Sequence, residues 1–255
     1  MSFRAVEVLK SVHMIVAEDT RHSRTLLDEY GIKTPYSPCH EHNEAAETPR
    51  LVSHLKDGKS IALITDAGTP LVSDPGARLT RAAIEAQVQV IAIPGSSAVL
   101  AGLVVSGIAA EQFTFLGFLP RKGKERQQAI DATVRSSITT VIYEAPGRVA
   151  DTLNDLVKAG APDRQASVSR ELTKKFEETR RGTITELAAH FGSADAKGEF
   201  VLVISGAEAV EISDDDIRSA VAQMKQDGRS PREITDRLIA QFGTARNRAY
   251  KFAHE

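Results

Sequence analysis

Several features that define whole classes of protein are missing from this chain. Cys39 is the only cysteine among 255 residues, so no internal disulfide can form, and we expect a reducing, cytoplasmic setting. No apolar run reaches the length of a bilayer span, and the first residues lack the charged-then-apolar pattern of a signal peptide. We therefore expect no membrane partner.

The chain also lacks a large net charge. Its 32 basic and 34 acidic residues leave a net charge of −2, which is not typical of a protein that coats nucleic acid. Any contact with nucleic acid must therefore come from local basic patches. One covers residues 121–126, and a second lies beyond residue 228 at Arg229, Arg232, Arg237, Arg246, Arg248 and Lys251. On charge alone, both patches are explained equally well as solvated surfaces.

Familiar cofactor and metal motifs are absent as well. The sequence contains no intact G-x-G-x-x-G, G-x-x-x-x-G-K, H-E-x-x-H or C-x-x-C pattern. Interpretations as a nicotinamide enzyme, a nucleoside triphosphatase or a zinc protein therefore lose support. His40 and His42 are closely spaced, but they lie in a polar segment and are more simply explained as solvated, so we expect no metal.

What the sequence does contain is an alternation of strand-like and helical patterns. Strand-like runs cover residues 12–16, 61–64, 88–93, 113–118, 138–143, 166–169 and 200–204. Helical patterns cover residues 20–30, 44–56, 76–85, 98–105, 124–135, 148–158 and 183–191. The alternation predicts an α/β fold with largely parallel strand pairing. We expect two α/β subdomains, residues 1–109 and 110–207, that join near residues 107–112.

Beyond residue 206 the strand-like runs stop. Residues 214–225, 231–241 and 244–253 have the pattern of three short helices, with Ser213 and Ser230 as caps and Gly228 and Gly243 as breaks. We expect residues 208–255 to form a helix-turn-helix-like appendage. A small bundle that only caps the fold explains the same pattern equally well.

The breaks that follow the strand-like runs carry the candidate ligand chemistry. Residues 60–64 run into residues 65–76, which no buried strand would tolerate because they are rich in glycine and proline. Glycine and alanine let the backbone approach a ligand, and Asp66 can accept hydrogen bonds from it. Since ligands of open α/β sheets bind beyond the carboxyl ends of the strands, this segment predicts a small-molecule site.

The first break, residues 17–24, places acids and bases at the start of a helix. Glu18 and Asp19 could act as caps, because acids are favourable at the positive end of the helix dipole. Arg21 and Arg24 oppose the same dipole, and an anionic ligand such as a phosphate would explain them.

Two further breaks repeat the theme. Ser96 and Ser97 stand at a helix N-terminus and suit a carboxylate or a ribose, although a serine cap is the simpler explanation. After residues 138–142, Tyr143 can stack on a ring and Glu144 can accept a hydrogen bond from a ligand.

The segments form an ordered set at residues 17–23, 65–76, 94–98, 115–122, 143–148, 170–174 and 198–200. Together they resemble the bacterial 16S ribosomal RNA 2′-O-ribose methyltransferases, a family of the tetrapyrrole-methylase superfamily. The resemblance covers nearly the whole chain and includes a helical tail. It implies two α/β subdomains with S-adenosylmethionine in the cleft between them, and a homodimer.

The resemblance also implies an activity and a set of contacts. The activity is methylation of the 2′-hydroxyl of a cytidine ribose in the 16S RNA of the 30S subunit. The implied cofactor contacts are Asp66, Ala67, Gly68, Ser96, Ser97, Tyr143, Leu172 and Glu199. A ribose hydroxyl is a poor nucleophile until its proton is removed, so our hypothesis gives Glu18 or Asp19 the task of positioning or deprotonating it. The residues expected to hold phosphates are Arg21, Arg24, Arg121, Lys122 and Lys124.

Two alternatives stay open. One keeps the methyl donor and makes a tetrapyrrole the acceptor, although such an acceptor would not require the basic residues 121–126. The other is an inactive homologue that binds S-adenosylmethionine or RNA. This second alternative arises because family members begin with a further strand and a Pro-Ile-Gly-Asn-like loop before a helix matching residues 5–10. This sequence starts at Met1 and does not include that strand or loop. We expect added upstream sequence to raise cofactor affinity.

Overall fold

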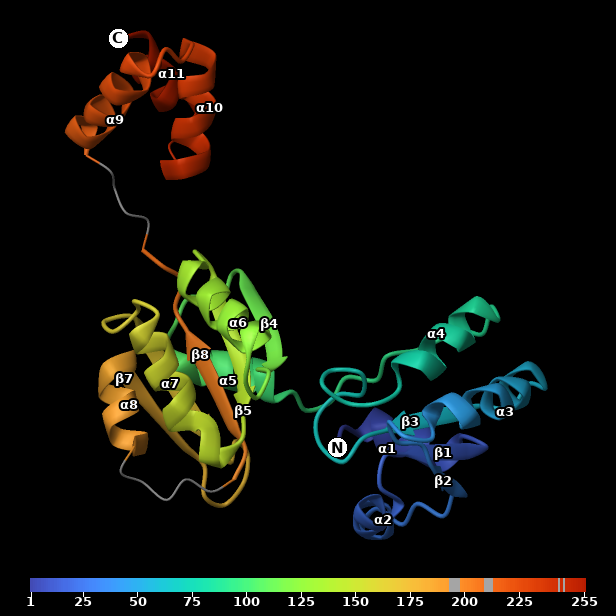
Figure 1. The fold of residues 1–255 in the computed structure, drawn as a ribbon. Helices are drawn as coiled ribbons and strands as arrows, with labels where there is room; N and C mark the ends of the chain where they lie inside the picture. The colour runs from blue at the N-terminus through green and yellow to red at the C-terminus, as the bar shows by residue number, and fades with distance from the viewer. Residues whose placement is uncertain (193–197, 209–212, 243, 245) are drawn as a thin grey trace. The chain divides into compact units, whose positions relative to one another are not determined.

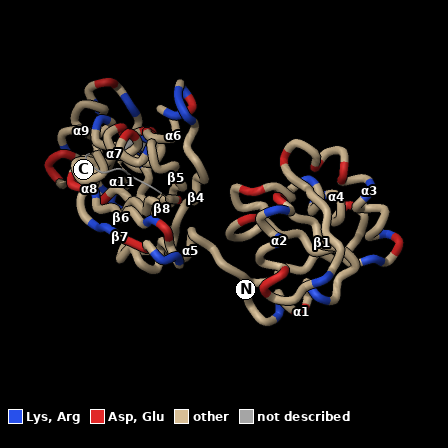
Figure 2. Tube along the Cα trace, turned by 90° about the horizontal axis from the view of Figure 1, so that it is seen from below, with Lys and Arg blue, Asp and Glu red and all other residues tan. Residues whose placement is uncertain are grey.

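The computed structural model describes residues 1–192, 198–208, 213–242, 244 and 246–255 (Figure 1). The chain divides into two compact units, Met1–Ala207 and Glu208–Glu255, and each is described by itself. Within the described residues, no helix is long and apolar enough to cross a membrane. Acidic and basic residues are interspersed along both units (Figure 2).

The first sheet of the larger unit is parallel throughout. Its central strand β1 (Met14–Ala17) pairs with β2 (Tyr36–Pro38) on one side and β3 (Ile61–Ile64) on the other. The last pairs in register are Ala17 with Pro38 and Ala17 with Ile64, so all three strands end at one edge. The residues that leave β1 and β3 therefore emerge side by side.

Helices cover both faces of this sheet because the side chains of β1 alternate between two cores. Ile15 packs with Leu9 and Leu27, and Val16 packs with Leu51 and Leu79. The first pair of partners comes from α1 and α2, the second pair from α3 and α4. These helices are α1 (Phe3–Ser11), α2 (Thr20–Glu29), α3 (Glu44–Lys56) and α4 (Ala77–Glu85).

The second sheet has the strand order β4-β5-β8-β6-β7 and is mixed. Only β4 and β5 are parallel among its pairs of described strands, and β8 runs antiparallel to both of its neighbours. The strands are β4 (Phe113–Phe118), β5 (Thr139–Glu144), β6 (Gln165–Arg170), β7 (Glu178–Thr183) and β8 (Phe200–Ile204).

Every residue of the central strand β8 is buried. Phe200, Leu202 and Ile204 face a core that includes α6, α7 and α8, whereas Val201 and Val203 face α5. The helices are α5 (Ala98–Ser106), α6 (Lys124–Arg135), α7 (Val149–Lys158) and α8 (Ile184–Gly192), with a short 3-10 turn η1 (Pro146–Arg148) before α7.

Helix α5 packs closely on the second sheet through Gly102. A Cβ atom added there would lie 2.7 Å from Cγ1 of Val201, closer than real Cβ contacts occur. Residues 98–106 thus share a core with the residues of the expected second subdomain. The division of residues 1–207 at position 109 stays a prediction.

The smaller unit consists of α9 (Asp214–Gln226), α10 (Pro231–Phe242) and α11 (Arg246–His254). Ile217, Ile234, Leu238 and Phe252 belong to its own buried core. Ser213 caps α9 by accepting a hydrogen bond from the Asp216 backbone, 3.1 Å. A capping box at Ser230 and Glu233 starts α10. The prediction of a three-helix appendage is confirmed, while Gly243 lies outside the described residues.

The expected α/β class is confirmed, but some sequence-based details are wrong. Parallel pairing holds for the first sheet and for β4 with β5, not for the antiparallel pairs around β8. Residues 88–93 form no strand, and Val90 and Ile91 are 50% and 57% exposed there. No neighbouring strand covers these side chains within the described sheets. Strands β2 and β7 were not predicted, because β2 is short and contains a proline and β7 is mostly polar.

Candidate active site

A cavity of about 310 Å³ lies within the larger unit, at the edge where β3 ends. Its walls come from the β3–α4 loop, the start of α5, the ends of β4 and β5, and the start of β8. It is lined by Ala67, Gly68, Thr69, Val72, Ser73, Asp74, Ser97, Ala98, Phe118, Tyr143, Glu144, Ala145, Pro146, Gly198, Glu199, Phe200 and Val201. Five of the eight predicted cofactor contacts are in this set: Ala67, Gly68, Ser97, Tyr143 and Glu199.

The loop of residues 65–76 has an unusual backbone. Leu71 and Ser73 adopt φ values of +73° and +68°, which cost most L-residues on the order of 1–3 kcal/mol each. Gly76 has φ +120°, and an added Cβ would collide with the Leu63 side chain. The Thr69 hydroxyl donates to the Ser96 carbonyl, 3.0 Å, and ties the loop to the segment before α5. Such strain often marks functional sites.

Ser96, Asp66 and Leu172 do not line the cavity but support it. The Ser96 carbonyl accepts the bond from Thr69, and Leu172 packs against the core that contains Val99 and Val141. Asp66 stands at the end of β3 and accepts a hydrogen bond from the Asp19 backbone, 3.2 Å. These three predicted contacts therefore belong to the layer around the cavity.

The acids that follow β1 and β3 are hydrogen-bonded to each other's segments, because the register places the ends of these strands side by side. While Asp66 binds the Asp19 backbone, the Asp66 backbone donates to Oε2 of Glu18, 3.4 Å. The predicted catalytic residue Glu18 thus holds the loop that forms one wall of the cavity.

Asp19 is engaged by Arg21. It caps α2 by accepting from the Arg21 backbone, 2.8 Å, and its carboxylate pairs with the Arg21 guanidinium, 2.7 Å. These side-chain hydrogen bonds hold the pKa of Asp19 far below its usual range. Arg24 lies 3.5 Å from Asp28 on the same helix. Both predicted phosphate-binding arginines of α2 therefore have a carboxylate partner and remain well exposed.

Asp74 is a residue that the sequence analysis did not single out, although it lies in a quoted segment. It lines the cavity, and burial, followed by repulsion from Glu18, Asp66 and Glu199, raises its pKa to about 6. A carboxylate with this pKa can take up a proton near neutral pH. Its sequence signal was only its position beside Ser73 and Pro75, within the loop already assigned to ligand binding.

Aromatic side chains form another wall. The Tyr143 ring lies 5.6 Å from the Phe118 ring and 4.8 Å from the Phe115 ring, centroid to centroid. Burial raises the pKa of the Tyr143 hydroxyl. Phe118 is 56% exposed, an unusual state for a phenylalanine, and it lies directly before the basic loop. This wall offers apolar aromatic surface to a ligand ring.

The opposite rim joins residues 171–174 to the start of β8. Lys174 lies 3.1 Å from both Glu171 and Glu199, and the Glu171 backbone donates to the Glu199 carbonyl, 3.2 Å. Glu171 and Thr173 have positive φ values of 49° and 66°. This strained loop therefore adjoins the cavity through Glu199, which lines it.

The basic loop that follows β4 carries Arg121, Lys122 and Lys124, all exposed. Arg121 lines a second, open hollow beside α7. Within the described part of the chain, no group of three or more His, Cys, Asp or Glu side chains could hold a metal ion.

Comparison with known proteins fixes the family. The family model described as Tetrapyrrole (Corrin/Porphyrin) Methylases matches residues 1–188. A relative from Mesorhizobium japonicum, "Ribosomal RNA small subunit methyltransferase I", is 46% identical over 210 residues, covering 82% of this chain and 71% of the relative. The chain belongs to the tetrapyrrole methylases, and within them to this group of methyltransferases. The Synechocystis member of the same name is 39% identical over 100% of this chain and 92% of its own.

Solved structures of this superfamily share the fold. Diphthine synthase superposes with a TM-score of 0.63 at 15% identity, covering 81% of this chain and 84% of its own. Uroporphyrin-III C-methyl transferase from Thermus thermophilus, complexed with S-adenyl homocysteine, has a TM-score of 0.56 at 17% identity and coverages of 80% and 90%. This methyltransferase chain thus keeps the tetrapyrrole-methylase fold at low identity to the solved structures.

Proposed function

We propose that this methyltransferase transfers a methyl group from S-adenosylmethionine to the 2′-hydroxyl of a cytidine ribose in the 16S RNA of the small ribosomal subunit. The observation that carries the proposal is the cavity at the end of β3, in a chain whose relatives of 38–46% identity are named for small-subunit ribosomal RNA. We place the reaction in the cytoplasm, where such a substrate is found.

The residues of the cavity fit the chemistry of the donor. Its volume of about 310 Å³ falls within the range of small-molecule sites. Tyr143 and Phe118 offer apolar surface for the adenine ring, and Gly68 allows close backbone approach. The carboxylates of Asp74 and Glu199 suit ligand hydroxyls and positive charge. Two further lining residues complete the proposed donor contacts, Ala67 and Ser97. The cavity is supported from the layer around it by Asp66, Ser96 and Leu172. When bound, the donor supplies a methyl group activated by a sulfonium.

The chain itself must orient the acceptor hydroxyl and remove its proton. Asp74 is the best-placed base that the structure offers, because it lines the cavity and its pKa is about 6. Glu18 contributes through its negative charge, which helps to raise that pKa, and through its bond to the Asp66 backbone. Asp19 acts as a positioning residue, since its carboxylate is held by Arg21.

The exposed bases are placed to hold the RNA backbone. Arg121, Lys122 and Lys124 follow Phe118 of the cavity wall within a few residues, and Arg21 and Arg24 follow Glu18. Phosphate contacts of this kind position the substrate without reading its sequence.

We further propose a homodimer that covers the exposed face of α5. Leu100 and Val104 lie one helical turn apart and are 56% and 84% exposed. Apolar side chains this exposed on a helix favour burial against a partner. The mass in solution tests this directly: the wild type should be dimeric, and Val104→Glu should shift it toward the monomer. A monomeric wild type at micromolar concentration would refute the dimer.

The decisive test is transfer of a radiolabelled methyl group to 30S subunits that lack the modification, followed by mapping of the labelled nucleotide. The proposal expects label on a cytidine 2′-oxygen. A tetrapyrrole offered as acceptor in parallel addresses the first alternative, and label there but not on RNA would contradict the proposal. Donor binding without label on either acceptor would favour the inactive homologue.

A further inference from the structure

A second hollow, of about 520 Å³, opens between the basic loop, α6 and α7. Four bases, two acids and one amide line it: Arg121, Arg126, Arg148, Asp151, Asn154, Asp155 and Lys158. The four bases outnumber the two acids, and Arg121 is the one lining residue to which the proposed methyl transfer already assigns a role.

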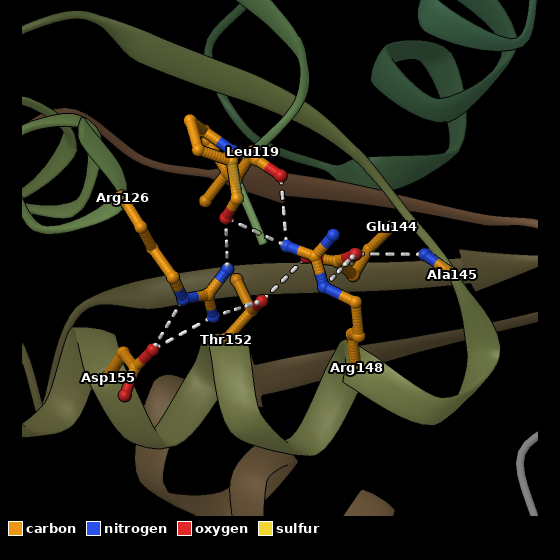
Figure 3. A network of polar contacts seen from close by, with 8 residues as sticks. Leu119, Arg126, Glu144, Ala145, Arg148, Thr152 and Asp155 are labelled. Atoms are coloured by element: carbon orange, nitrogen blue, oxygen red, sulfur yellow. Dashed lines mark hydrogen bonds and ion pairs between the residues drawn. The ribbon is translucent and has the colours of Figure 1, made fainter. Parts of the chain in front are cut away.

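Two of the four bases are held rigidly. Arg126 is 9% exposed, and it donates to Asp155, 3.0 Å, and to the Thr152 hydroxyl, 3.0 Å (Figure 3). Arg148 lies 3.3 Å from the fully buried carboxylate of Glu144. Guanidinium groups fixed in this way lose little side-chain entropy when an anion binds near them.

The same arginines also hold the base of the basic loop through neutral acceptors. Arg148 donates to the carbonyls of Leu119, 2.9 Å, and Pro120, 3.2 Å, and Arg126 donates to the Pro120 carbonyl, 3.3 Å (Figure 3). Arg121, the next residue of the chain, therefore starts from a fixed point at the rim of the hollow.

The hollow and the active-site cavity share a wall. Glu144 lines the cavity, and its carboxylate accepts from the Thr152 hydroxyl, 2.6 Å, and the Ala145 backbone, 2.9 Å, besides pairing with Arg148. Phe118 lines the cavity two residues before Pro120. A chain-like substrate with one group in the cavity can thus reach the hollow with a neighbouring group.

One neutral side chain of the hollow also suits an anion. Asn154 supplies an amide that can donate to a phosphate oxygen.

We propose that this hollow binds a phosphate group of the RNA backbone next to the acceptor nucleotide. The inference rests on the proposed function, because it takes RNA as the substrate. Arg121 and Lys158 contact the phosphate from the exposed rim, and Asn154 donates to it. Arg126 and Arg148, whose charges are paired with Asp155 and Glu144, act as positioning residues that hold the loop.

The test compares the double variant Arg121→Ala/Lys158→Ala with the control Lys10→Ala/Arg135→Ala, which removes two exposed bases at helix ends outside the hollow. Binding of a short single-stranded RNA is measured over a range of salt concentrations. We expect the first variant to weaken binding about tenfold at low salt. The slope of log K against log salt should decrease by about 0.7, the value for one phosphate contact on a single strand.

The control should keep both the affinity and the slope of the wild type, and donor affinity should stay unchanged in both variants. Equal slopes for the two variants would overturn the inference, even if methyl transfer to 30S subunits is intact. Inorganic phosphate is titrated separately. If phosphate binds the wild type but not the first variant, and the salt dependence of RNA binding is the same in both, the hollow is a site for free phosphate. That result would also overturn the inference. Failure of all methyl transfer with an altered slope would instead count only against the proposed function.

Discussion

The active-site cavity and the basic hollow lie on two sides of Glu144, yet their construction differs. The cavity adjoins strained loops at residues 65–76 and 171–174, and its charged lining residues, Asp74, Glu144 and Glu199, are acidic. The hollow is built on fixed arginines and is mainly basic. An acidic cavity suits a cationic methyl donor, and a basic hollow suits a polyanion. One unit can therefore bind the donor and the substrate at separate sites of opposite charge.

Removing the carboxylate of Asp74 should produce the largest functional effect. Asp74→Asn keeps the shape of the cavity but cannot accept the acceptor's proton, so methyl transfer at saturating donor should fall about 10²- to 10⁴-fold. Single-turnover transfer to 30S subunits measures this.

A Glu18→Gln variant serves as the companion to that experiment. It removes one of the negative charges that raise the pKa of Asp74, so the acidic limb of the pH–rate profile should move to lower pH. An unchanged rate in Asp74→Asn, or an acidic limb that does not move in Glu18→Gln, would remove Asp74 from the role of base.

The wall between the cavity and the hollow should depend on the ion pair of Glu144 with Arg148. Glu144→Ala leaves the Arg148 guanidinium partly buried without its carboxylate partner, which should lower the free energy of unfolding by about 3–5 kcal/mol. Urea unfolding of the whole chain measures the loss. The matched control Glu47→Ala breaks an ion pair with Arg50 near the surface and should cost less than about 1 kcal/mol. Similar losses in the two variants would show that the wall is not specially stabilised.

The pH dependence of stability should reveal the raised pKa of Asp74 in the cavity. Because the pKa of Asp74 is raised from 3.8 to about 6 on folding, the folded chain binds the proton more tightly than the unfolded chain. Asp74 therefore lowers stability progressively as pH rises from about 4 to 6, and the full penalty remains above that range. Asp74→Asn should have a higher Tm than the wild type at pH 7.5, and the difference should shrink toward pH 4. A Tm difference independent of pH would contradict the shift.

The smallest expected effect concerns the exposed bases of α2. Arg21→Ala should weaken methylation of RNA about tenfold at most, because it removes one exposed charged contact to phosphate, while donor affinity stays the same. Calorimetric titration with the donor and methylation at limiting RNA separate the two quantities. Loss of donor binding would instead show that Arg21 acts on the cavity by releasing Asp19.

Much of this arrangement could be predicted from the sequence because it depends on local signals. The bounds of α3, α6, β3, β4 and β8 match the periodic patterns, and the break at residues 65–76 marks the loop that lines the cavity. Charge and burial in three dimensions could not be predicted in this way. The pKa of Asp74 is raised first by its burial and then by nearby acids, two of which, Glu18 and Glu199, lie on other segments. The contacts of Arg126 with Asp155 and of Arg148 with Leu119 each span 29 positions.

The strands that were wrongly predicted or missed have a similar explanation. The apolar run at residues 88–93 can form a strand only beside a neighbouring strand, and none lies there within the described sheets. The edge strand β7 is polar, as exposed edges often are, so its sequence gives little sign of pairing.

The most direct test of the account is a crystal structure of this chain with S-adenosylhomocysteine, the product left by the donor. We predict density in the cavity of about 310 Å³, with contacts to Gly68, Asp74 and Tyr143. Density at any other position, or a cavity closed by the loop of residues 65–76, would contradict the central claim that methyl transfer takes place there.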